Sequence, residues 1–409
     1  MYSLVYQKKA LNYCSVNLPT SKSISNRALI LNAFLKQQVQ LHNLSNADDT
    51  QLMVKALSQS QPVINLENAG TCMRFLTAYF ACMENQVTEL LCNERMKQRP
   101  IKELVEVLNY LGADIEYLAQ SNYPPLKIKG ATLQGKPIEI DASQSSQYIT
   151  ALMLIGPFIQ NGLSIQLKGQ VASFDYIKMT ASLMDVFGFD VLVNETNIEI
   201  KPLTKPILLT EYTIEKDWSS AAFWYLMAAL ETDLKVCLNG LSKSSIQGDK
   251  VTSEIFEKLG VRSEETADGL LIYKYTNSGS DMHFDLSACI DLAPALCVAC
   301  AALNIKATIF GLQNLVVKES NRLVAIVNEL NKLGYHITHT SNSIFIDQMA
   351  QIDYQKAVVI DTYDDHRIAM AFAPLAVLFS QLQIKDIKVV SKSYPAYFDD
   401  LSRAGITVK

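Results

Sequence analysis

Polar loops, amphipathic helical stretches and short alternating runs recur along the chain in a fixed order. A loop rich in Ser, Asn, Lys or Arg leads into a helix with one apolar face, a glycine follows, and two short β-rich runs complete the unit. The clearest copies cover residues 93–130, 169–201, 240–273 and 311–347. A further copy at 390–409 ends with the chain, and one at 43–66 is cut short before its two β-rich runs. The pattern predicts a repeated α/β unit.

A glycine follows the helix in five of these copies, at Gly112, Gly188, Gly260, Gly334 and Gly405. Glycine adopts positive φ at little steric cost, so it is common just after the last helical residue. The spacing of about 70–75 residues leaves room for a second helix in each unit. Strongly apolar stretches predict these second helices, which begin at Ser23, Gly70, Ser145, Ser219, Asp291 and His366. Their apolar character indicates that they are buried.

Six βαβαββ-like units in 409 residues are most simply divided between two domains. We expect residues 20–215 to form a continuous domain of three units, the first of them truncated. The first strand, residues 1–19, then pairs with the three units of residues 216–409. The predicted fold class is α/β, with a hinge at the two chain crossings and a substrate cleft between the domains.

Composition limits where in the cell the protein is expected and what it is expected to bind. The longest apolar stretches, 293–303 and 368–379, are shorter than the ~18–20 residues of a membrane span, and residues 1–19 lack the apolar run of a signal peptide. The eight cysteines are scattered, which favours reduced thiols in the cytoplasm. Cys297 and Cys300 match half of a redox or zinc motif, but core packing is the better interpretation of their apolar helix. No membrane partner is expected, and a monomer is weakly favoured.

The net charge is −5 and no basic run is present, so nucleic acid is not expected as a partner. An anionic ligand therefore requires a local group of cations. Of only eight arginines, six lie in loops before predicted helices or in their first turns: Arg27, Arg74, Arg95, Arg99, Arg322 and Arg367. Because the planar guanidinium binds carboxylate and phosphate through two hydrogen bonds, these positions predict an anion-binding site.

Several predicted helix starts combine cations with hydroxyl groups and backbone N–H groups. The residues are Lys22, Ser23 and Arg27 in the first, Gly70 and Arg74 in the second, Ser145, Ser146 and Gln147 in the third, and Ser173 with Tyr176 in the fourth. Such starts suit phosphate. The alternative is that the hydroxyls are ordinary helix caps, that the cations are solvated, and that Asn68–Gly70 is a plain turn.

Two later motifs place cations beside acids, a mixture suited to charge binding together with proton transfer. They are Lys318, Glu319 and Arg322, and Asp364 to Arg367. Asp291, at another helix start, is a candidate general base, although capping explains it and Asp364 and Asp365 more simply. The five histidines lack metal-ligand spacing, and no phosphate-binding glycine loop is present, so we expect no metal.

Taken together, eight motifs between residues 18 and 398 resemble those of the 5-enolpyruvylshikimate-3-phosphate synthases. In order they are SKSxSNR, NAGTxMR, RMKxRPI, SSQ, SxxY, KExxR, DHRxAM and KSYP. The ordered set is far more specific than any one motif. The resemblance implies a two-domain inside-out α/β barrel with three βαβαββ units in each domain, which agrees with the repeat.

The resemblance also implies the reaction and the residues that serve it. The enolpyruvyl group of phosphoenolpyruvate would pass to the 5-hydroxyl of shikimate 3-phosphate, with release of phosphate and without any cofactor. Phosphoenolpyruvate would contact Lys22, Gly70, Arg99, Gln147, Arg322, Arg367 and Lys392. Shikimate 3-phosphate would contact Lys22, Ser23, Arg27, Ser145, Ser146, Gln147, Ser173, Asp291, Asn314 and Lys318. The catalytic residues would be Glu319 as acid to the carbon, Asp291 as base to the hydroxyl, and Lys22.

This chain departs from the family pattern in three places. The segment 57–67 is short, Asn321 stands where Asp is common, and Thr20 stands where Gly is common. We expect the first to trim the continuous domain, the second to weaken a contact that orients Arg322, and the third to alter the hinge turn. Gly70 after Ala69 also suggests sensitivity to glyphosate-like mimics of phosphoenolpyruvate.

Two rival interpretations remain at this stage. A sister enolpyruvyl transferase acts on UDP-N-acetylglucosamine, but its usual catalytic Cys loop has no match here. A phosphometabolite sensor that has lost catalysis would lack Asp291, Glu319 or Lys22, and all three are present.

Overall fold

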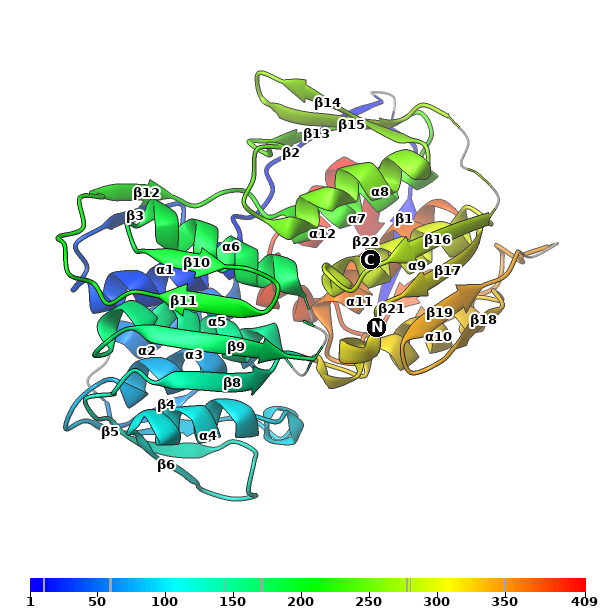
Figure 1. Cartoon of the computed structure of the whole chain (residues 1–409). Coiled ribbons are helices and arrows are strands. Elements are labelled where there is room, and N and C mark those ends of the chain that lie inside the picture. The colour runs from blue at the N-terminus through cyan, green and yellow to red at the C-terminus, as the bar shows by residue number, and fades with distance from the viewer. Residues whose placement is uncertain are drawn as a thin grey trace. The chain divides into compact units, whose positions relative to one another are not determined.

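The computed structural model describes residues 1–9, 12–58, 61–143, 145–169, 171, 173–276, 279, 281–348 and 351–409. Helices and strands alternate along these residues, as the α/β prediction requires. The chain divides into two compact units, which Figure 1 shows. Unit 1 contains Met1–Thr20 and Glu215–Lys409, and unit 2 contains Ser21–Ile214.

Unit 2 contains helices of two kinds, strongly buried and half-exposed. They are α1 (Lys22–Phe34), α2 (Asp48–Ser58), α3 (Gly70–Ala81), α4 (Lys102–Leu111), α5 (Ser146–Ile155) and α6 (Phe174–Val186). The buried helices α1, α3 and α5 contact one another, and nearly every residue of α3 and α5 is inaccessible to solvent. This three-helix core positions the helix starts on which the predicted site residues lie.

Three sheets form from the described strands of unit 2. The first has the order β4 (Val63–Asn65), β5 (Val87–Leu91), β7 (Leu126–Lys129), β6 (Asp114–Tyr117). The second has the order β10 (Val191–Val193), β11 (Asn197–Ile200), β9 (Leu163–Lys168), β8 (Pro137–Asp141). The third pairs only β12 (Glu211–Thr213) and β3 (Gln40–His42), in parallel.

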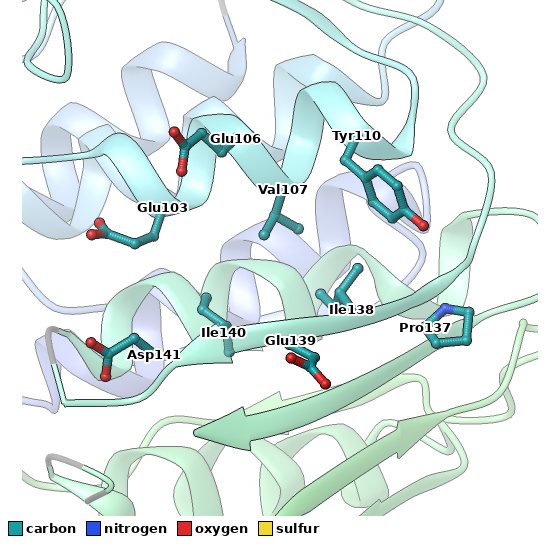
Figure 2. A pocket seen from close by; sticks show the side chains of 9 residues that line it. All are labelled: Glu103, Glu106, Val107, Tyr110, Pro137, Ile138, Glu139, Ile140 and Asp141. Carbon is teal, nitrogen blue, oxygen red and sulfur yellow. The ribbon is translucent and has the colours of Figure 1, made fainter. Parts of the chain in front are cut away.

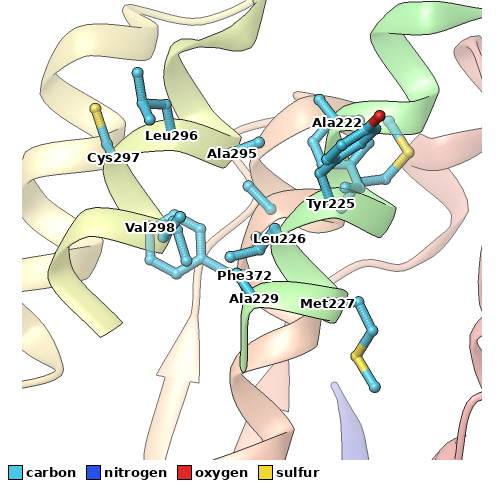
Figure 3. Packing of buried hydrophobic residues seen from close by; sticks show 14 of the residues in the cluster. Ala222, Tyr225, Leu226, Met227, Ala229, Ala295, Leu296, Cys297, Val298 and Phe372 are labelled. Carbon is cyan, nitrogen blue, oxygen red and sulfur yellow. The ribbon is translucent and has the colours of Figure 1, made fainter. Parts of the chain in front are cut away.

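Unit 1 repeats this plan with the helices α7 (Trp218–Leu230), α8 (Thr252–Lys258), α9 (Ala293–Ala302), α10 (Arg322–Lys332), α11 (His366–Phe372) and α12 (Tyr397–Arg403). Here α7, α9 and α11 contact one another. Figure 3 shows side chains of α7 and α9, with Phe372 of α11, packed together. Cys297 and Cys300 lie fully buried in α9, which confirms the packing interpretation, and burial raises the pKa of both thiols.

The described strands of unit 1 form three four-stranded sheets. Their orders are β20 (Val358–Ile360), β21 (Leu382–Ile384), β1 (Tyr2–Tyr6), β22 (Ile406–Val408); β14 (Val261–Thr266), β15 (Gly269–Lys274), β13 (Lys235–Asn239), β2 (Tyr13–Val16); and β16 (Asp281–Asp285), β17 (Lys306–Phe310), β19 (Ser343–Ile346), β18 (Ile337–His339).

The N-terminal segment corrects one prediction, because its described residues, 1–9 and 12–19, form two strands and not one. Strand β1 pairs antiparallel with β21 and β22, whereas β2 pairs parallel with β13 in another sheet. The exposed residues 7–9 interrupt the alternation of buried and exposed side chains between them. Each of two sheets in unit 1 therefore receives a strand from the N-terminus.

The predicted helix ends agree with the structure. Gly112, Gly188, Gly260, Gly334 and Gly405 all have positive φ, between 83° and 118°. The apolar stretch 368–379 is less regular than predicted: α11 ends at Phe372 and a 3₁₀ turn, Ala373–Val377, follows. Pro374 lacks the N–H that would continue the α-helical ladder. Within the described residues, every helix is too short or too polar to span a membrane.

Candidate active site

The start of α1 holds two of the predicted cations of unit 2. Ser21 caps the helix, since its side chain accepts a hydrogen bond from the N–H of Ile24, and Lys22 is the first helical residue. The ammonium of Lys22 lies 3.2 Å from a carboxylate oxygen of Asp49, at the start of α2. Ser23 accepts a hydrogen bond from Arg27 through its carbonyl oxygen at 2.8 Å.

Arg27 is 3% exposed and lies among neutral groups. Its Nε donates to Thr180 Oγ1 at 2.8 Å, and Nη2 lies 3.5 Å from Thr150 Oγ1. The guanidinium carbon also lies 5.3 Å from the ring centre of Phe75 and 5.8 Å from that of Tyr176. Burial lowers the pKa of Arg27 to about 10, so the side chain stays charged at neutral pH. A buried cation of this kind favours an anionic ligand.

The guanidinium of Arg99 packs directly against Gly70, the first residue of α3. A Cβ at Gly70 would lie 2.6 Å from Arg99 Nη1 and 2.7 Å from Nη2, so a larger residue here would displace the guanidinium from this position. Arg99 ends a short 3₁₀ turn, Met96–Gln98, in extended conformation, as a residue before proline should. The structure thus brings two predicted contacts of phosphoenolpyruvate together.

The start of α5 lies close to this pair. Ser145 caps the helix by accepting from the N–H of Gln147 at 3.3 Å, and Ser146 is its first residue. The side chain of Gln147 donates to Thr71 Oγ1 at 3.3 Å, next to Gly70. Ser173 precedes α6 with φ of +54°, an uncommon value for a residue with a side chain.

In unit 1, Arg322 joins three carboxylates from separate segments. It is 1% exposed and donates from Nε to Asp365 at 2.8 Å, from Nη1 to Asp291 at 2.9 Å and from Nη2 to Glu319 at 2.7 Å. Burial opposes the charge of Arg322, but the carboxylates outweigh burial and raise its pKa. The predicted acid and base therefore share one guanidinium.

Asp291 lies in the 3₁₀ turn Ile290–Leu292 before α9 and is surrounded by cations. Besides Arg322, its carboxylate lies 3.2 Å from Arg367 Nη2 and 3.5 Å from Lys318 Nζ. Burial alone would raise the pKa of Asp291, but Arg367, Lys318 and Arg322 together hold it well below the usual value. The group is thus a carboxylate at neutral pH, able to accept a proton but only weakly basic.

The remaining predicted residues of unit 1 lie near these groups to different degrees. Lys392 closes the 3₁₀ turn Lys388–Lys392, and its ammonium lies 3.7 Å from Glu319 Oε1. Asn314 lies in the turn Gln313–Val317, just before Lys318. Asn321 caps α10 as Asp would, accepting from the N–H of Val324 at 3.3 Å. Arg322 is oriented by its bonds to the three carboxylates.

Sequence reasoning undervalued two buried acids. Asp365 caps α11 by accepting from the N–H of Arg367 at 3.0 Å, as expected, but the same carboxylate also holds Arg322. Asp249 was not singled out at all; it accepts a hydrogen bond from Ser219 and is electrostatically coupled to Asp291 and Arg367. Burial raises the pKa of Asp249 to about 6. A Gln-Gly-Asp turn before a helix was the only local signal.

A groove elsewhere in unit 2 contains none of these residues. It has a volume of about 320 Å³ and lies between α4 and β8 (Figure 2). Glu103 and Glu106 of α4, Glu139 and Asp141 of β8 and several apolar side chains line it. Its carboxylates repel anions, so it is no candidate for the anion-binding site.

Comparison with known proteins decides the family. The family model described as EPSP synthase (3-phosphoshikimate 1-carboxyvinyltransferase) matches residues 6–62 and 57–401, nearly the whole chain. The chain belongs to this family. The motifs that suggested the resemblance are thus parts of one family-wide match.

Individual members of the EPSP synthase family match this chain over nearly their whole length. The chain is 43% identical over 396 residues to the 3-phosphoshikimate 1-carboxyvinyltransferase of Bacteroides fragilis, covering 97% of this chain and 96% of the relative. It is 36% identical over 432 residues to the protein of the same name from Photobacterium damsela subsp. piscicida, covering 98% and 99%. A solved EPSP synthase structure from Acinetobacter baumannii has the same fold, with a TM-score of 0.78 at 21% identity and 100% and 99% coverage.

Proposed function

We propose that this protein transfers the enolpyruvyl group of phosphoenolpyruvate to the 5-hydroxyl of shikimate 3-phosphate and releases phosphate. The relatives to which it is similar over nearly their whole length carry the name of that activity. The observation that carries the proposal is the unit 1 cluster, defined as Asp291, Lys318, Glu319, Arg322, Asp365, Arg367 and Lys392. Here two candidate proton-transfer carboxylates share a buried guanidinium.

The proposed substrates carry phosphate and carboxylate groups, which both units are equipped to bind. Lys22, Arg99 and Lys392 bind the phosphate of phosphoenolpyruvate, and Arg322 and Arg367 bind its carboxylate. Gly70 and Gln147 complete that set. Shikimate 3-phosphate is held by Lys22, Ser23, Arg27, Ser145, Ser146, Gln147, Ser173, Asp291, Asn314 and Lys318. The buried charge of Arg27, bonded to threonine hydroxyls, supports a role for it in binding an anion.

The reaction needs two proton movements. Glu319 donates a proton to the methylene carbon of phosphoenolpyruvate, which makes the adjacent carbon electrophilic, while Asp291 takes the proton of the attacking 5-hydroxyl. The tetrahedral intermediate then loses a proton from the new methyl group, and the carbon–oxygen bond to phosphate breaks. The products are the enol ether and phosphate. Lys22, Lys392 and the arginines stabilise the negative charge on the groups that react.

The electrostatics of Asp291 add a condition to this scheme. Its pKa is held low by Arg367, Lys318 and Arg322, which makes it a weak base. A substrate carboxylate that binds Arg322 and Arg367 competes for the same cations and weakens their interaction with Asp291. Binding of phosphoenolpyruvate therefore raises the basicity of Asp291 when the base is needed.

Phosphate release tests the proposal. Purified protein is assayed with shikimate 3-phosphate and phosphoenolpyruvate, with either substrate omitted, and with UDP-N-acetylglucosamine in place of the shikimate. We expect release only with the first pair, and a fall in kcat of about a thousandfold in Glu319→Gln, the range of general acid catalysis. Glu116→Gln, an exposed position on β6, is the matched control.

Two outcomes would contradict the proposal. Tight binding of both substrates without phosphate release would identify a sensor, and release with UDP-N-acetylglucosamine would identify the sister activity. Location and assembly are also part of the proposal: we infer a cytoplasmic monomer, and the eight free cysteines fit a reducing compartment. Sedimentation of the purified protein would reveal a larger assembly.

A further inference from the structure

The carbonyl oxygen of Pro100 accepts hydrogen bonds from two buried side chains on different helices. Arg74 of α3 donates from Nη2 at 2.9 Å, and the hydroxyl of Tyr148 of α5 donates to the same oxygen. Both donors are almost inaccessible, at 4% exposed for Arg74 and 2% for Tyr148. Two buried donors converging on one loop carbonyl hold that loop far more firmly than a solvated turn.

Pro100 directly follows Arg99, so fixing its carbonyl fixes Arg99 as well. The pyrrolidine ring restricts the Pro100 φ angle, which leaves little freedom between that carbonyl and the Arg99 backbone. The Arg99 N–H bonds to the Met96 carbonyl at 3.0 Å, and the guanidinium packs on Gly70. Arg74 holds the Gly70 side of this contact too, since Nη1 donates to the Gly70 carbonyl at 3.2 Å.

We propose that Tyr148 is a positioning residue which, together with Arg74, fixes Arg99 against Gly70 for binding the phosphate of phosphoenolpyruvate. This inference rests on the proposed function, which assigns that phosphate to Arg99. Tyr148 is one residue after Gln147, whose side chain bonds to Thr71. The start of α5 therefore sets the Arg99 loop and the start of α3 together.

The chemistry of the phenol suits a permanent donor. Burial raises the pKa of Tyr148, although the neighbouring Arg74 opposes the shift, so the hydroxyl keeps its proton throughout the neutral range. Because a carbonyl can only accept, the bond persists as long as the phenol is protonated. Phenylalanine at this position would fill the same space without the bond.

The test is Tyr148→Phe, with KM and kcat measured separately. Losing one buried hydrogen bond while Arg74 keeps the other should raise the KM for phosphoenolpyruvate about fivefold and change kcat by less than about twofold. In an Arg99→Gln background the same substitution should change KM no further, because its effect passes through Arg99. Tyr225→Phe, which removes a buried hydroxyl bonded to Ser263 in unit 1, is the control and should leave KM unchanged.

The outcomes separate this inference from the proposed function. An unchanged KM in Tyr148→Phe, or an equal rise in the Arg99→Gln background, would overturn the positioning role while phosphate release by the parent protein stands. If the parent protein releases no phosphate, the proposed function fails, and a crystal structure of Tyr148→Phe decides the inference instead. A guanidinium of Arg99 displaced from Gly70 supports positioning, and one that stays in place refutes it.

Discussion

Arg322 of unit 1 and Arg27 of unit 2 are both almost fully buried, yet their partners differ in kind. Arg322 bonds to the carboxylates of Asp365, Asp291 and Glu319. Arg27 bonds to two threonine hydroxyls and a backbone carbonyl, and within the described residues no acidic side chain forms an ion pair with it. Burial lowers the pKa of Arg27, whereas carboxylates, acting against burial, raise that of Arg322.

Under the proposed function, this difference suits the two buried arginines to separate tasks. A cation that is already neutralised by acids helps to place those acids and to set their basicity, which suits proton transfer. A cation among neutral groups has unneutralised charge, which suits binding of an external anion. Under the proposed function, unit 1 combines substrate binding with the groups of the chemical step, whereas Arg27 of unit 2 serves substrate binding alone.

The largest effect should come from removing the neutralised cation. Arg322→Met leaves three carboxylates without their shared guanidinium, and breaking such a buried network should cost about 3–5 kcal/mol of unfolding free energy. Urea unfolding of the variant beside Arg262→Met, an exposed position on β14, measures the loss. A loss equal to that of the control would mean that the carboxylates do not depend on Arg322.

The substitution Arg27→Met should lower substrate affinity and not stability. Because the partners of Arg27 among the described residues are neutral, its removal should leave urea stability unchanged or slightly higher. The affinity for shikimate 3-phosphate should fall about a hundredfold with the loss of charged hydrogen bonds. Calorimetric titration and urea unfolding on the same preparation measure both quantities. A large loss of stability with normal affinity would remove the distinction between the units.

Asp249→Asn should make stability less dependent on pH. The folded pKa of about 6 lies above the ordinary value of 3.8, so the unfolded chain ionises first as pH rises, and stability is lost between those two values. The parent should lose about 2 kcal/mol through this group between pH 4 and pH 7, and the variant should not. Parallel urea curves at the two pH values give the difference, and an identical loss in both proteins would contradict the assignment.

Gly70→Ala should have the smallest effect. The new methyl group would lie within 2.8 Å of the Arg99 guanidinium, which moves away because it ends a flexible side chain. We expect the KM for phosphoenolpyruvate to rise about tenfold, a loss of roughly one charge-assisted hydrogen bond, with the melting temperature nearly unchanged. An unaltered KM would mean that Arg99 accommodates the methyl group without leaving its position.

Local sequence patterns predict the helices and their ends, but not the network of hydrogen bonds that joins them. The glycine stops and the caps at Ser145 and Asp365 depend on neighbours within a few residues, so periodicity and residue type predict them. The bond from Arg322 to Asp365 spans 43 positions, and that from Tyr148 to Pro100 spans 48. No local pattern encodes such pairs.

The same limit explains how Asp365 and the N-terminus were treated. Capping accounted for Asp365 so simply that its second partner, Arg322, was not expected. The alternation in residues 1–19 correctly predicted β-structure. The placement of β1 and β2 in two different sheets depends on β13, β21 and β22, which come more than 200 residues later. Family motifs supplied candidate site residues without the bonds between them.

Asp365 also limits how this enzyme can be altered. One carboxylate sets the first turn of α11, where Arg367 lies, and the guanidinium of Arg322 on α10. The two arginines proposed for a single substrate carboxylate therefore cannot be retuned one at a time from this position. Changing one arginine without the other would require a second acid to take over one of these bonds. A change of donor substrate should therefore need at least two substitutions.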